Sequence, residues 1–273
     1  MLLRTEVRSG FTPPRTLLRR SAALWLVTAI AGQLIFAIYI AGLYGRSALA
    51  GNMSGWNAVM PHGYVRGDAL GNSVIAAHLL LAVVIIIGGA AQLTPWIRRR
   101  VPAVHRWTGR MYLVSSMATS LAGLYLTWVR GSVGDMSQHI AISLNALILL
   151  SCATVAWRSA RARDFVAHRR WALRTFLAAG GVFFFRLGLM LWVVLFRRPV
   201  GFDPHTFTGP FLTVLAFAVY VVVPLTVLEL YLSAESSRRR SVQAIMALAM
   251  VVLSIVTGAA IAVTTVGMWL PRL

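Results

Sequence analysis

The stretch HLLLAVVIIIGGAAQLTPWIRRRVPAVHRWTGR, residues 78–110, decides the fold because it holds one helix, a basic turn and the start of the next helix. Its apolar run ends at Trp96, a block of arginines follows, and a second long and mostly apolar run begins after His105. A run of about 20 apolar residues is long enough to cross a bilayer as a helix. The stretch therefore predicts two antiparallel transmembrane helices joined by a short, positively charged turn.

The same pattern returns in HIAISLNALILLSCATVAWRSARARDFVAHRRWALR, residues 139–174. In both copies a tryptophan follows the first histidine by 18 residues, and the two histidines lie 27 residues apart in the first copy and 29 in the second. Two helix pairs that run in the same direction form a parallel repeat, related by a pseudo-twofold axis along the membrane normal. Equivalent histidines then lie at equal depth, which predicts two pairs, His78 with His139 and His105 with His168.

Composition extends the membrane assignment to the whole chain. The 273 residues are 58% hydrophobic and only 12% charged, about half the charged fraction of a soluble domain. We therefore expect an all-α fold, a polytopic membrane helix bundle of about seven transmembrane helices, whose four-helix core is the tandem two-helix repeat. The predicted spans are residues 21–44, 72–95, 104–129, 137–157, 169–196, 210–232 and 242–269.

The basic residues indicate how these spans are oriented. All 26 are arginine, and they alternate from loop to loop, with 19 on one side of the predicted membrane, six on the other and Arg186 within a span. Arginine-rich loops face the cytoplasm in membrane proteins. The pattern predicts a multi-pass protein of the bacterial inner membrane, with a cytoplasmic N-terminus and an external C-terminus.

The same composition excludes several classes of function. A net charge of +19 can indicate nucleic-acid binding, but that reading needs a basic face on a soluble domain, and here the arginines lie between apolar runs. The absence of lysine excludes Schiff-base chemistry, and the single cysteine, Cys152, excludes a disulfide within the chain.

The spans and loops divide the chain into four parts. These are a cytoplasmic N-terminal segment (1–20), a first transmembrane helix with an external loop that suits an ordered cap (21–71), a four-helix haem-binding core (72–197) and two C-terminal transmembrane helices (198–273).

Four histidines, one on each core helix, point to haem. Two axial imidazoles from facing helices of a bundle can hold a b-type haem, whose propionates attract cations. Gly109, one turn from His105, would leave room for the macrocycle. Arginines surround the inner histidine pair and could bind propionates or a quinone head group. They are Arg106, Arg110, Arg169, Arg170 and Arg174.

Arg186 lies within a predicted span, where an unpaired arginine is unfavourable and implies an anionic or polar partner. A propionate of an outer haem is one candidate. Glu229 is a poor match in depth, and the side chain could instead extend to the outer surface.

We therefore expect a transmembrane protein that passes electrons through one or two bis-histidine haems b, between a quinol or small reductant and an acceptor. Trp96, Trp107, Trp157 and Trp171 are expected as interfacial anchors, or as rings stacked on haem or quinone. The alternative is a non-enzymatic carrier, assembly subunit or transporter whose histidines are structural or bind a metal ion. The sequence leaves the oligomeric state open.

Two resemblances accompany this reading. The stretch from His78 through Gln92 to Arg110, and His168–Arg174 with the helix after it, resemble a bacterial family of predicted membrane proteins. The broader layout is similar to cytochrome b561, a di-haem membrane protein with one histidine ligand on each helix of a four-helix core. That similarity implies the same pairing as the repeat, although the connections here are shorter and no ascorbate-binding motif is identifiable.

Overall fold

A computed structural model of the protein describes residues 14–60, 62–131 and 134–273. In this part of the chain the regular elements are helices, apart from one isolated β-bridge between Asp203 and Thr208, which confirms the all-α fold. In chain order the elements are α1 (Pro14–Ile40), η1 (Ala41–Gly45), α2 (Arg46–Leu49), η2 (Met53–Ala58), α3 (Ala69–Leu93), α4 (Pro95–Arg100), α5 (Pro102–Trp128), α6 (Met136–Arg161), α7 (Phe165–Ala179), α8 (Gly181–Phe196), α9 (Pro210–Phe217), η3 (Ala218–Val222), α10 (Val223–Ser236), α11 (Arg240–Thr264), η4 (Thr265–Trp269) and η5 (Leu270–Arg272).

Among the described residues, five helical segments are long and apolar enough to cross a membrane: Pro14–Leu49, Ala69–Leu93, Met136–Arg161, Pro210–Ser236 and Arg240–Arg272. A sixth forms if α7 and α8, bent by 49° at their junction, count as one broken span. The protein is therefore a multi-pass membrane protein. A helix occupies each predicted span, but α5 lies outside the set defined by length and apolar composition, so the count of seven stays a prediction.

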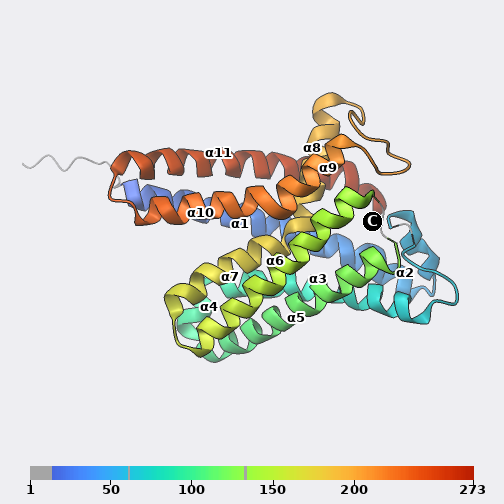
Figure 1. The fold of residues 1–273 in the computed structure, drawn as a ribbon, viewed down its shortest axis with the longest axis horizontal. Coiled ribbons are helices and arrows are strands. Elements are labelled where there is room, and N and C mark those ends of the chain that lie inside the picture. Colours follow the sequence, from blue (N-terminus) through green and yellow to red (C-terminus); the bar gives the residue numbers. More distant parts are fainter. Residues whose placement is uncertain (1–13, 61, 132–133) are drawn as a thin grey trace, which may run out of the picture.

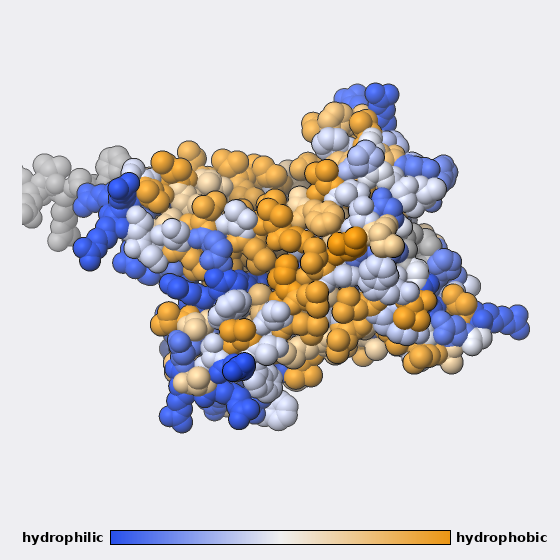
Figure 2. All heavy atoms as spheres, in the orientation of Figure 1, coloured by the Kyte–Doolittle hydropathy of each residue, from blue (hydrophilic) through white to orange (hydrophobic). Residues whose placement is uncertain are grey.

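The connections gather at two ends of the bundle (Figure 1). The start of α1, the α3–α5 connection with α4, the α6–α7 turn and the α10–α11 turn lie at one end, which we call the basic end. The opposite end, which we call the cap end, carries α2, η2 and the C-terminus. Figure 2 shows hydrophilic side chains at both ends and a mostly hydrophobic surface between them, as a bilayer requires.

The start of the first helix differs from the predicted boundary. Residues 1–13 of the expected N-terminal segment lie outside the described residues, but α1 already begins at Pro14, a residue suited to the first turn of a helix. Arg15, Arg19 and Arg20 therefore belong to the first turns of α1 rather than to a segment before it.

The predicted fifth span is broken at Gly180. An added Cβ there would lie 2.8 Å from Phe184, and one on Gly181 would lie 2.6 Å from the Tyr220 ring of η3. Glycines allow these close approaches and are a common cause of sharp helix bends. The bend makes the second half of the repeat unlike the first, because α5 continues unbroken to Trp128.

The described residues between η1 and α3, 46–60 and 62–68, form a cap that contacts the ends of the neighbouring helices. Trp56 is buried, and its indole Nε1 donates to the Tyr44 carbonyl at 3.0 Å. The Arg130 side chain, only 4% exposed, joins the cap to the end of α5. It donates to Asp68 at 2.9 Å and Asn72 at 2.6 Å, and also to the backbone carbonyls of residues 62 and 63.

A glycine brings α1 and α11 together. A Cβ on Gly32 would collide with Ile261 and lie 2.9 Å from the Phe183 ring. We expect Gly32→Val to destabilise the protein by about 1–3 kcal/mol, the usual effect of overpacking, and to lower the thermal unfolding midpoint in detergent. Gly258→Ala is the matched control at the same helix pair, because its Cβ would meet Thr28 at an ordinary 3.7 Å. Equal midpoints for the two variants would contradict the close packing.

Candidate functional site

His105 and His168 both lie at the basic end. Each sits in the first turns of its helix, α5 or α7. The His168 Nδ1 atom lies 3.0 Å from the Ala156 carbonyl of α6, to which it can donate. The Nδ1 atom of His105 is buried and has no hydrogen-bond partner among the described residues. The pairing of His105 with His168, which the repeat predicts, stays a prediction.

A glutamine of α3 holds the start of α5 in place. The Gln92 amide donates to the His105 carbonyl at 3.2 Å and to the Thr108 hydroxyl at 2.5 Å. A Cβ on Gly109 would lie 2.8 Å from the Gln92 side-chain oxygen. In this structure, the space that Gly109 leaves is therefore taken by Gln92, whereas the sequence analysis expected it to admit a macrocycle.

Two aromatic rings close the interior below the inner pair. Tyr112 follows His105 by seven residues, about 10 Å along the same face of α5, and Phe176 follows His168 by eight. Both rings are buried and lie against Gly89 of α3, where a Cβ would be 3.3 Å from Tyr112 and 3.2 Å from Phe176. We call these two rings the Tyr112–Phe176 layer. Space for a flat ligand near the histidines would therefore lie on the basic-end side of this layer.

The four tryptophans, predicted as anchors or stacking rings, separate into two groups. Trp96 and Trp107 are 64% and 66% exposed, which suits interfacial anchors. Trp157 and Trp171 instead pack against the core cluster that contains Tyr112. These two rings, rather than the first two, lie where a flat ligand beside His168 would meet aromatic surface.

The predicted arginines have different surroundings. Arg174 binds Glu229 of α10 at 2.7 Å and lies over the Trp171 ring, while Arg169 binds Glu235 at 3.1 Å. Glu229 is therefore engaged with Arg174, which agrees with its rejection as a partner of Arg186. Three others are exposed and take part in no ion pair among the described residues. They are Arg106, Arg110 and Arg170.

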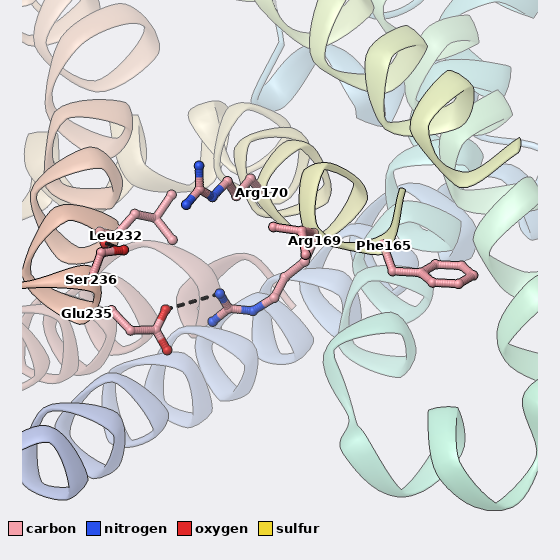
Figure 3. A pocket seen from close by; sticks show the side chains of 7 residues that line it. Phe165, Arg169, Arg170, Leu232, Glu235 and Ser236 are labelled. Carbon is pink, nitrogen blue, oxygen red and sulfur yellow. Dashed lines mark hydrogen bonds and ion pairs between the residues drawn. The ribbon is translucent and has the colours of Figure 1, made fainter. Parts of the chain in front are cut away.

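A shallow pocket of about 280 Å³ lies beside the α7 arginines (Figure 3). The Arg169–Glu235 ion pair crosses from α7 to α10, and Arg170 also lines the pocket. Apolar side chains complete the lining, among them Phe165 and Leu232. The pocket thus combines cationic and apolar groups, but it is smaller than a haem and does not include the inner histidines.

The outer pair is arranged differently. The His78 ring lies over Gly123 of α5, with its Cε1 atom 3.6 Å from an added Cβ, and its Nδ1 is buried without a hydrogen-bond partner among the described residues. His139 instead packs edge-on against Trp128, at 5.8 Å between ring centroids. Positions 123 and 128 are about 140° apart around α5. The two imidazoles therefore contact different positions on α5, and their pairing stays a prediction.

Arg186 lies apart from the histidines, on α8. Its guanidinium carbon is 5.2 Å from the centre of the Phe36 ring of α1, and its nearest hydrogen-bond acceptor is the Val182 carbonyl at a long 3.5 Å. A propionate of an outer haem is one candidate partner predicted for Arg186, and in this structure the guanidinium lies over the Phe36 ring of α1.

The chemistry available at the inner pair is that of two imidazoles. No group of three or more histidine, cysteine, aspartate or glutamate side chains in the described ranges is placed to hold a bare metal ion. A haem needs only two axial imidazoles, since the porphyrin supplies the other ligands. The donor set at His105 and His168 therefore fits a haem iron by residue type.

The region of the chain that holds the four histidines is also the region that matches a known family. A family model described as a predicted membrane protein (DUF2306) matches residues 75–232, which is more than half of the chain. The chain belongs to the DUF2306 family of predicted membrane proteins. No curated protein and no solved structure matches it. The expected resemblance to a family of predicted membrane proteins is thus confirmed, and the resemblance to cytochrome b561 stays a hypothesis.

Several residues of this candidate site were not expected from the sequence. The Ala156 carbonyl orients His168, and the Tyr112–Phe176 layer bounds the interior. A backbone carbonyl leaves no sequence signal, so Ala156 could not have been found. Tyr112 could have been found, because it lies seven residues, or about two helical turns, after His105 and therefore on the same face of α5.

Proposed function

We propose that this protein is a b-type cytochrome-like protein of the bacterial inner membrane that binds haem at its basic end through His105 and His168. The observation that carries the proposal is the 3.0 Å contact between His168 Nδ1 and the Ala156 carbonyl. Histidines that bind metals usually donate their other ring N–H to a carbonyl or carboxylate, which fixes the ring and its tautomer. His168 Nε2 is then left available as an axial ligand.

The surroundings of the inner pair support a flat, anionic cofactor. Trp157 and Trp171 offer aromatic surface, and the Tyr112–Phe176 layer limits how deep such a group can extend. Arg106 and Arg110 keep free guanidinium groups for the propionates, whereas Arg169 and Arg174 are already paired with glutamates. When bound, a haem supplies one-electron transfer.

The two outer rings contact positions of α5 that are about 140° apart, an arrangement that does not favour a second haem between them. We therefore propose one haem at the inner pair first. A second at His78 and His139, as the repeat predicts, would require α5 to shift. Electron flow from a quinol or small reductant to an acceptor across the whole membrane depends on that second haem.

We also propose that α5 completes a set of seven spans. Its 27 residues would extend about 40 Å, and its polar side chains include the buried hydroxyls of Ser116 and Ser120. These donate to carbonyls one turn earlier at 2.8 and 2.9 Å, so they carry no unsatisfied group into the bilayer. The polar residues lower the mean hydropathy of α5 while facing the bundle. With seven spans, the positive-inside rule places the basic end in the cytoplasm.

Proteoliposomes test electron transfer. We expect protein that carries haem at both histidine pairs to pass electrons from ascorbate outside to ferricyanide trapped inside, faster than in liposomes without protein. A rate equal to the protein-free baseline would contradict transmembrane electron transfer. If haem is nevertheless present, the inner site would then act at one membrane face only.

The alternative is a non-enzymatic carrier, assembly subunit or transporter with structural histidines. The packing of His78 on Gly123 and of His139 on Trp128 favours this reading for the outer pair. It predicts a colourless protein in which replacing His78 changes stability without changing any redox signal.

A further inference from the structure

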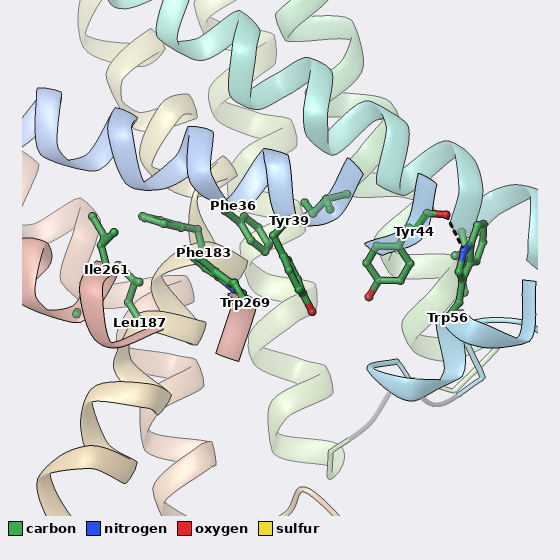
Figure 4. Packing of buried hydrophobic residues seen from close by; sticks show 11 residues of the cluster. Phe36, Tyr39, Tyr44, Trp56, Phe183, Leu187, Ile261 and Trp269 are labelled. Carbon is green, nitrogen blue, oxygen red and sulfur yellow. Dashed lines mark hydrogen bonds between the residues drawn. The ribbon is translucent and has the colours of Figure 1, made fainter. Parts of the chain in front are cut away.

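Four aromatic rings form a stack near the cap end, built by α1, α8 and η4 (Figure 4). The Trp269 ring lies 5.3 Å from Phe36, 6.1 Å from Tyr39 and 6.3 Å from Phe183, centroid to centroid, with each pair close to parallel. The stack contains none of the four repeat histidines.

Hydrogen-bond donors in this cluster lack acceptors. The Thr265 hydroxyl and the Trp269 Nε1 are buried without a partner among the described residues, and the Tyr39 hydroxyl, which Arg272 approaches as a donor, has no acceptor there for its own proton. Tyr39 and Trp269 are each only 1% exposed. An indole N–H can only donate, so a buried Trp269 without an acceptor indicates a group that the protein itself does not supply.

Arg186 adds a positive charge to the same cluster. It lies over Phe36, and both Arg186 and Arg272 are within electrostatic range of Tyr39 and Tyr44. In Figure 4 the hydroxyls of Tyr39 and Tyr44 point into the same space.

No carboxylate in the described part of the chain pairs with Arg186. The acidic side chains there are engaged elsewhere, either in ion pairs with other arginines or in hydrogen bonds to backbone N–H groups. They are Asp68, Asp135, Asp164, Asp203, Glu229 and Glu235. An arginine within a membrane helix needs a compensating group, and such residues usually mark a ligand or ion site.

We propose that Arg186, Tyr39 and Trp269 form a binding site for a phosphate-type oxyanion at the cap end of the bundle. An anionic oxygen would accept from the indole N–H and the tyrosine hydroxyl and would neutralise the guanidinium. The anion can come from the head group of an acidic phospholipid or from free phosphate, since both present the same oxygens. The site needs no haem and is independent of the proposed function.

Thermal unfolding of the full-length protein in a neutral detergent tests this site with two probes. One arm compares sodium phosphate with sodium chloride at equal ionic strength, and the other compares added phosphatidylglycerol with phosphatidylcholine. We expect at least one anionic probe to raise the unfolding midpoint. Stabilisation by phosphate identifies a free-anion site, and stabilisation by phosphatidylglycerol alone identifies a lipid head-group site.

Three variants assign the effect to named atoms. Arg186→Gln should abolish the stabilisation, while Trp269→Phe and Tyr39→Phe keep the rings, remove one donor each and should weaken the apparent affinity about tenfold. The two ring-preserving variants keep the test valid if Arg186→Gln does not fold. Arg66→Gln, at an exposed arginine of the cap, should respond like the wild type. No stabilisation by either probe, or an unchanged response in the three variants, would overturn the proposal.

Discussion

Replacing His105 or His168 by alanine is expected to abolish the b-type haem absorbance of the purified protein. Each substitution removes one of the two axial imidazoles that we assign to the same iron, and a single remaining ligand does not give a low-spin bis-histidine haem. His168→Ala also removes the ring that the Ala156 carbonyl orients. The measurement is the haem content per chain, together with the reduced visible spectrum of each variant.

Two sets of control variants test whether the loss of haem is specific to His105 and His168. His205→Ala, at an exposed loop histidine, should leave the spectrum unchanged and controls for expression and purification. His78→Ala and His139→Ala should leave the inner haem signal in place, because their rings contact α5 rather than the inner site. Full haem content in both His105→Ala and His168→Ala would rule out the assigned ligands.

Asp68→Ala is expected to cause the largest loss of stability in the cap. It leaves the Arg130 guanidinium, 4% exposed, without the carboxylate it binds at 2.9 Å, and it also removes the side chain that caps α3 by accepting from the Gly71 N–H. Breaking a buried ion pair usually costs several kcal/mol. We expect about 3 kcal/mol, near the low end, because Asp68 is itself partly exposed. The thermal unfolding midpoint in detergent measures the loss.

Matched variants separate the two roles of Asp68. Asp135→Ala removes an equivalent helix cap on α6, where the side chain accepts from the Gln138 N–H and forms no ion pair in the described chain, and should cost about 1 kcal/mol. Asp68→Asn keeps an acceptor for the cap but loses the charge, so it should fall between the two. Gly71→Ala should also destabilise the cap, because its Cβ would collide with Arg130 and Asp68. If Asp68→Ala lost no more stability than Asp135→Ala, Arg130 would not depend on its carboxylate.

Long apolar runs and arginine blocks were enough to locate the helices. A helix occupies each of the seven predicted ranges, because apolar length and flanking charge are properties of a single segment. The bend between α7 and α8 was missed although Gly180 and Gly181 were visible, since many glycines in membrane helices do not bend them. The ring that lies against Gly181 at the bend is Tyr220, a residue about 40 positions later in the chain, and such a contact is not visible in the local sequence.

The repeat predicts the depths of the four histidines but not which rings face one another. Equal sequence offsets place His78 and His139 at similar depth, but depth does not determine which face of a neighbouring helix each ring meets. That depends on the rotation of each helix about its axis, which is set by packing. The contacts of His78 with Gly123 and of His139 with Trp128 depend on this rotation.

The partners of the arginines could not be assigned by position along the chain. All five arginines around the inner pair were expected as cofactor ligands, yet Arg169 and Arg174 bind glutamates of α10. These contacts span about 55 to 66 residues of sequence and join two separate parts of the bundle. Only the tertiary arrangement shows that Arg106, Arg110 and Arg170 are the three that form no ion pair in the described part of the chain.

The reduced-minus-oxidised visible spectrum of the wild-type protein tests the central claim most directly. The protein would be purified from a bacterial host with ample haem, and its bound haem would be counted per chain. We predict the sharp α band of a b-type haem after dithionite reduction and at least one haem per chain. A correctly folded protein that is colourless, without an α band, would contradict the assignment of His105 and His168 as haem ligands.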